Sequence, residues 1–129
     1  MTGAPRLLFR KRHRLSKNLD YQAVFDASVR KSRGPMTVYT LPNALGHARL
    51  GLSVSRKVGN AVRRGRLKRL VREAFRQLQH ELPGSYDLVV VLRAHPPRAL
   101  GAYRDDLESC VREAHRVWAR RAERDSGDG

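Results

Sequence analysis

The sequence of 129 residues predicts a single α/β (α+β) domain, a two-layer sandwich in which a small mixed sheet packs against about three helices. Two observations predict this class. Runs of β-forming residues alternate with segments of helical periodicity, and residues 48–93 have the pattern of a strand, a helix and a second strand. Hydrophobic residues make up 40% of the chain, which is enough for a buried core at this length.

The first elements are a short helix and two strands. The helix is expected from about Asn18 to Ala27, with Asn18 as its N-cap. Its apolar positions follow i, i+3, i+4 spacing and are Tyr21, Val24 and Phe25. The runs MTVYTLP (36–42) and ARLGLSVSRK (48–57) are rich in β-formers, and we expect these two strands to pair with each other across the turn between them.

A long helix, a strand and a final helix follow. Asn60 is a plausible cap for the first of these helices. Its apolar stripe is formed by Leu67, Leu70, Val71, Ala74, Phe75 and Leu78. The run YDLVVVLR is apolar throughout, which is typical of a central strand covered on both faces. The last helix is expected from about Arg98 to Glu123, with Cys110 on its apolar side.

The ends of the chain are expected to lie outside the domain. Residues 1–14 predict a flexible basic arm, residues 15–122 the domain, and residues 123–129 a disordered tail. No apolar run approaches the roughly 18 residues of a membrane span, and no signal peptide is evident. The single cysteine, Cys110, excludes an internal disulfide. We therefore expect a cytoplasmic protein with no membrane partner, and no protein partner is evident.

The positive charge is concentrated in two segments. The net charge is +15; residues 6–17 carry six Arg or Lys and no acid, and residues 56–76 carry nine against Glu73. These segments account for +6 and +8, which leaves +1 for the rest of the chain. A general solubility device would spread the charge more evenly, so this distribution predicts a polyanionic partner.

The basic helix carries its cations at the unfavourable end. Arg63, Arg64, Arg66, Lys68 and Arg69 lie in its first turns with no acidic residue among them. A helix N-terminus is partially positive, so each cation there costs about 0.3–1 kcal/mol. A solvated surface is the common explanation of a charged helix face, but phosphate contacts would offset this cost, and Arg grips phosphate with two hydrogen bonds.

Three stretches carry a resemblance to a known family. The segment GLSVSRKVGNAVRRGRLKRLVREAF (51–75) resembles the signature of the bacterial ribonuclease P protein component, whose basic helix has an Arg-Asn-Arg core followed by an apolar residue, Lys and Arg. RHRLSKNLDYQAVF (12–25) resembles the family's first helix, and VYT (38–40) resembles its first strand. The resemblance runs from about Lys11 to Trp118. Gly65 departs from it, because the family usually has Asn at this position.

The resemblance implies a fold and a function. The fold is an α-β sandwich like the second domain of a small-subunit ribosomal protein, with a left-handed βαβ crossover where the general rule favours a right-handed one. The function is that of the protein subunit of a ribonucleoprotein endoribonuclease, which removes the 5′ leader of precursor tRNA. Catalysis resides in the RNA subunit, with Mg²⁺ held mainly by RNA, and the protein alone is not expected to cleave.

The resemblance also implies two groups of binding residues. Those expected to bind the catalytic RNA subunit are Arg56, Lys57, Asn60, Arg64, Arg66, Lys68, Arg69 and Arg72. Those expected to line a cleft for the single-stranded leader are Tyr21, Phe25 and Tyr39. From their spacing alone, these aromatic residues are more typical of a core. In a cleft they would stack on leader bases without sequence selection.

The sequence offers poor candidates for catalysis or metal binding. Asp105, Asp106 and Glu108 lie in the first half of the last helix, where acids favour the helix dipole. The five histidines lack metal-ligand spacing. Two rival functions remain: a ribosomal or general RNA-binding protein with no role in cleavage, and a self-sufficient metal nuclease.

Overall fold

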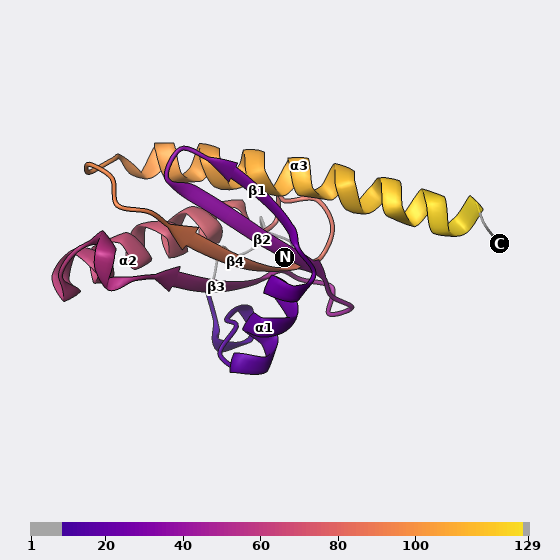
Figure 1. Cartoon of the computed structure of the whole chain (residues 1–129), viewed down its shortest axis with the longest axis horizontal. Coiled ribbons are helices and arrows are strands. Elements are labelled where there is room, and N and C mark those ends of the chain that lie inside the picture. Colours follow the sequence, from indigo (N-terminus) through magenta and orange to yellow (C-terminus); the bar gives the residue numbers. More distant parts are fainter. Residues whose placement is uncertain (1–8, 128–129) are drawn as a thin grey trace, which may run out of the picture.

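The computed structural model describes residues 9–127 and has one sheet and three α-helices (Figure 1). In chain order the elements are η1 (Lys11–His13), α1 (Asn18–Asp26), β1 (Val29–Arg33), β2 (Met36–Pro42), β3 (Arg49–Val54), η2 (Arg56–Val58), α2 (Ala61–Leu78), β4 (Tyr86–Leu92) and α3 (Leu100–Gly127), where η1 and η2 are single 3-10 turns. The predicted α+β class is confirmed.

The sheet is mixed and has the strand order β1-β2-β4-β3. β2 is antiparallel to both β1 and β4, whereas β3 is parallel to β4. The expected pairing of β2 with β3 is wrong, because β4 lies between them. The apolar β4 is buried on both faces of the sheet and takes the central place. The β3–α2–β4 segment is the expected crossover between parallel strands, and its hand stays a prediction of the resemblance.

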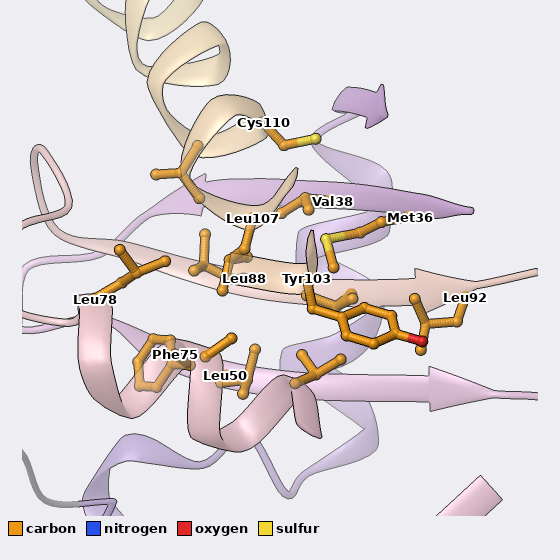
Figure 2. Close-up of a cluster of buried hydrophobic side chains, with 14 of the residues drawn as sticks. Met36, Val38, Leu50, Phe75, Leu78, Leu88, Leu92, Tyr103, Leu107 and Cys110 are labelled. Atoms are coloured by element: carbon orange, nitrogen blue, oxygen red, sulfur yellow. The ribbon is translucent and has the colours of Figure 1, made fainter. Parts of the chain in front are cut away.

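The helices cover the two faces of the sheet unequally. α2 and α3 pack on one face, where they enclose the main core around Phe75, Leu88 and Tyr103 (Figure 2). Cys110 belongs to this core, and burial raises the pKa of its thiol to about 11. α1 packs on the other face over a smaller cluster centred on Val89. On that face Tyr39 and Val91 remain only partly buried.

Within the described residues, the segments near both ends differ from expectation. The segment from residue 9 to 14, predicted to be part of a flexible arm, packs on the edge of β3: His13 is only 5% exposed and Arg14 forms a β-bridge with Leu50. Residues 1–8 lie outside the described residues. The predicted disordered tail is also wrong as far as residue 127, because α3 continues to Gly127 and extends past the sheet (Figure 1). Residues 128 and 129 are not described.

Two smaller features also differ from expectation. The N-cap of α1 is Lys17 rather than Asn18, and no side chain accepts a hydrogen bond from its first turn. The strand β1 was not expected, because four of its five residues are polar and only Val29 is buried.

Within residues 9–127, no helix is both long and apolar enough to cross a membrane.

Candidate nucleic-acid interface

The N-terminus of α2 is held by a side-chain cap and by two of its own arginines. Asn60 Oδ1 accepts a hydrogen bond from the Arg63 backbone N–H at 2.9 Å, as its sequence position predicted. Arg63 Nε donates to the Val58 carbonyl at 3.3 Å, and Arg64 Nε donates to the Gly59 carbonyl at 3.2 Å. Asn60 and Arg64 therefore have structural roles in addition to any contact with a ligand.

The remaining cations of the basic face point away from the core. Arg66 and Arg69 are exposed, and Lys68 and Arg72 are half-buried. Among the described residues none of these four takes part in a salt bridge. The preceding turn η2 adds two exposed cations, Arg56 and Lys57. By contrast, Arg76 pairs with Glu73, and hydrogen bonds from Arg76 lower the pKa of the Glu73 carboxyl. The uncompensated charge thus lies in η2 and in α2 as far as Arg72.

Tyr21 lies between α1 and the backbone of β3. Its hydroxyl accepts a hydrogen bond from the Leu52 N–H at 3.1 Å. A Cβ atom at Gly51 would come within 2.7 Å of the Tyr21 ring, so the ring needs a glycine at that position. Tyr21 is half-buried and is one wall of a groove whose other walls include Phe9, Lys68 and Arg72. This groove joins the aromatic side of the sheet to the basic helix.

Phe25 and Tyr39 form the second part of the aromatic surface. Their rings make an edge-to-face pair with centroids 4.8 Å apart. The Arg30 guanidinium lies 6.0 Å from the centroid of the Tyr39 ring and donates to the Tyr39 hydroxyl at 3.2 Å. Phe25, Arg30 and Tyr39, with Ser28, line an open hollow of about 410 Å³. Two of the three rings predicted to bind the leader thus lie together, with a cation at their edge.

Phe9, Arg14 and Arg30 are the candidate residues that sequence reasoning missed. Arg30 lies on β1, which was not expected, and Phe9 and Arg14 belong to the segment expected to be flexible. The Arg14 guanidinium lies 5.1 Å from the centroid of the Phe9 ring, and Arg14 lines the Tyr21 groove. The basic composition of residues 6–17 was the available signal, but it did not show where the segment packs.

Two of the three acidic residues considered for metal binding, Asp106 and Glu108, pair with arginines. Asp106 is buried and accepts a hydrogen bond from Arg98 at 2.8 Å, while Arg33 lies 3.6 Å from its second oxygen. Glu108 pairs with Arg112 one turn later in α3. Across residues 9–127, no three His, Cys, Asp or Glu side chains are grouped so that they could hold a metal ion.

Comparison with known proteins places these features in one family. The family model described as Ribonuclease P matches residues 9–120. The ribonuclease P protein component of Methylococcus capsulatus is 46% identical over 86 residues, which cover 66% of each chain. That of Shouchella clausii is 41% identical over 108 residues, covering 81% of this chain and 88% of the relative.

Solved structures of RNase P proteins have the same fold as this chain. A mutant RNase P protein of Staphylococcus aureus, described as defective in mRNA degradation, superposes with a TM-score of 0.71 at 33% identity, covering 81% of this chain and 90% of that one. The RNase P protein of Thermotoga maritima gives a TM-score of 0.67 at 31% identity, covering 73% and 90%.

Proposed function

Since this chain belongs to the ribonuclease P protein family, we propose that it binds the catalytic RNA subunit through the basic face of α2 and the 5′ leader of precursor tRNA through the aromatic surface. Membership makes it the protein component of a ribonucleoprotein with ribonuclease P activity, and so gives it an RNA partner. Which surface meets which RNA is the proposal.

One observation supports this assignment above the others. The uncompensated cations in the first three turns of α2 adjoin the Tyr21 groove, and that groove leads towards the Phe25 and Tyr39 rings. A polyanion on α2 would release counterions and offset the cost of cations at a helix N-terminus. A single strand leaving that site could then stack on rings that accept any base.

The proposed contribution of the protein is to favour binding of precursor tRNA, which carries the leader, over mature tRNA. Precursor tRNA has a leader and mature tRNA does not, so a surface that binds only the leader raises affinity for the precursor alone. We place the cleavage chemistry, and Mg²⁺, mainly in the RNA subunit and substrate. This division makes the cytoplasm, where tRNA is processed, the proposed location.

A reconstitution assay tests the division of labour. Purified protein is incubated with precursor tRNA, with and without the matching RNA subunit. We expect cleavage only with the RNA subunit present, and acceleration by the protein at low Mg²⁺. Cleavage by the protein alone would favour a self-sufficient nuclease. A protein with no effect on the RNA-catalysed reaction would favour a ribosomal or general RNA-binding role.

The basic face is tested by charge removal with a matched control. The variant Arg64→Ala/Arg66→Ala/Arg69→Ala should bind the RNA subunit more weakly, and its salt dependence should flatten by about 0.7–0.9 for each phosphate that the protein no longer neutralises. The control variant removes the same charge from the far part of α3, at the exposed Arg116, Arg120 and Arg124. Equal reductions of affinity in both variants would mean that only net charge matters, and the assignment of α2 would be wrong.

The aromatic surface is tested by a change that keeps apolar volume. Tyr39→Leu should weaken precursor binding by the holoenzyme by about 1–3 kcal/mol, the range for removal of one stacked base. Affinity for mature tRNA and for the RNA subunit should hardly change. The deciding quantity is the ratio of the affinities for precursor and mature tRNA. A basic surface that only screens phosphate charge would raise the affinity for both and leave this ratio unchanged. An unchanged ratio with a lower thermal stability would make Tyr39 a core residue.

A further inference from the structure

A cavity of about 270 Å³ opens between the first half of α2 and the start of α3. Its apolar lining includes Leu67 and Tyr103, which are buried, and Leu70 and Leu100, which remain partly exposed. It lies on the face of the sheet covered by α2 and α3, whereas Tyr21, Phe25 and Tyr39 belong to the opposite face. The cavity is therefore separate from the aromatic surface described above.

Three arginines also line this cavity, and their charges are not equally balanced. Arg98 is paired with Asp106 at 2.8 Å. Arg63 donates to the carbonyls of Val58 and His95 and, among the described residues, makes no salt bridge with a carboxylate. Arg66 is exposed and is likewise in no ion pair within residues 9–127. The cavity thus combines apolar walls with two cations that pair with no carboxylate in the described part of the chain.

The combination of apolar and cationic side chains in this lining indicates which kind of ligand fits it. A free phosphate would satisfy the cations but leave Leu70 and Leu100 facing water. A purely apolar ligand would leave the half-buried Arg63 without a counterion. A nucleotide meets both needs, because its base is flat and apolar on its faces and its phosphate pairs with guanidinium groups.

We propose that this cavity receives one unstacked nucleotide of the RNA subunit, with its base against Leu70 and Leu100 and its phosphate beside Arg63 and Arg66. The inference rests on the proposed docking of α2 on that RNA, because Arg66 belongs to both surfaces. It adds a site that recognises an unpaired nucleotide. An RNA double helix presents phosphates along its whole length, but only an unpaired nucleotide can place its base in the cavity.

The test fills the cavity without removing charge. Ala99 lines the cavity and is exposed, and its backbone carbonyl accepts a hydrogen bond from the Ala102 N–H, which a change of side chain leaves in place. Ala99→Trp should therefore occupy the space intended for the base. Ala94→Trp is the matched control, since Ala94 is exposed on the same connection but does not line the cavity. Binding of the RNA subunit is measured over a salt series, and its bases are probed chemically in each complex.

We expect Ala99→Trp to weaken RNA-subunit binding by about tenfold or more, as for removal of one stacked base, while the salt slope changes by no more than the share of one phosphate. One unpaired base should be protected in the complex with the original protein or with Ala94→Trp, and reactive in the complex with Ala99→Trp. Leu70→Gln repeats the test from the opposite wall if Ala99→Trp lowers stability.

The inference is overturned if both cavity variants bind as tightly as the original protein, or if no base changes its reactivity. That failure is distinguishable from failure of the proposed function. If the cavity variants are silent while Arg64→Ala/Arg66→Ala/Arg69→Ala weakens binding, only the nucleotide site is wrong. If the triple variant is also silent, the docking of α2 on the RNA subunit is wrong as well.

Discussion

Gly51 on β3 allows the hydroxyl end of the Tyr21 ring to lie close to the strand, and replacing Gly51 tests that arrangement directly. An alanine Cβ at Gly51 would lie 2.7 Å from Tyr21 Cζ and 2.8 Å from Tyr21 Oη. Real Cβ contacts are not this short, so the ring must move away. The movement would break the 3.1 Å hydrogen bond from the Leu52 N–H to the Tyr21 hydroxyl. We therefore expect Gly51→Ala to lower stability and to open the Tyr21 groove.

The expected magnitude is a balance of three effects. Overpacking costs about 1–3 kcal/mol, and breaking the hydrogen bond costs about 0.5–1.5 kcal/mol. Alanine in place of glycine in a strand offsets roughly 0.5–1 kcal/mol of this loss in the free energy of unfolding, because it lowers the entropy of the unfolded chain. The net decrease in the free energy of unfolding is therefore about 0.5–4 kcal/mol, measurable by urea denaturation.

A double-mutant cycle isolates the cause. In a Tyr21→Ala background the ring is absent, so Gly51→Ala should be neutral or slightly stabilising. Precursor tRNA binding should fall in each single variant, while binding of the RNA subunit should stay close to that of the original protein. If Gly51→Ala costs the same free energy with and without Tyr21, the contact between the two residues is not its cause and this reasoning is refuted.

Two further predictions concern stability. Gly65 lies inside α2, and a Cβ there would meet only Arg69 Nη1 at 3.5 Å, an ordinary contact. Gly65→Ala should therefore raise the free energy of unfolding by about 1 kcal/mol, as measured by urea denaturation. A lower free energy of unfolding would mean that the glycine is structurally required. Burial, with the nearby Arg12 charge, lowers the pKa of His13 below its ordinary 6.5. Because the unfolded chain then binds the proton more readily, stability should fall as the pH drops from 6.5 towards the folded-state pKa, and His13→Gln should flatten that part of the thermal-stability profile; an unchanged profile would contradict the assignment.

The sequence predicted the elements that carry a clear pattern of apolar residues and missed the strand that does not. α2 shows its apolar stripe, and β4 is apolar throughout, so both were found with nearly correct bounds. β1 buries only Val29, and its place comes from backbone pairing with β2, which leaves no pattern in side-chain type. Strand order failed for a related reason: adjacency in sequence favours pairing β2 with β3, but the most apolar strand takes the centre of the sheet.

The candidate site was predicted residue by residue but not as a surface. Tyr21, Phe25 and Tyr39 were identified from a resemblance, and the structure brings the last two into contact. What the sequence could not give is the connection from these rings to α2, because that connection is formed by Phe9 and Arg14 packing on β3. A flexible arm and a packed edge segment have the same composition when only a few apolar side chains hold the segment in place.

The charge at the start of α2 shows how folding and binding share the same residues. Arg63 and Arg64 turn back towards the carbonyls of Val58 and Gly59, so these two guanidinium groups help to hold the turn that precedes the helix. Arg66, Lys68 and Arg69 have no such role, and in the free protein they only add repulsion next to a partially positive helix end. A sequence selected for stability alone would replace these three first. Their presence is the physical reason to expect that the folded domain is completed by a polyanion. It is also why the lower affinity of the triple variant should come with no decrease in stability from Arg66 and Arg69, and with a small decrease from Arg64.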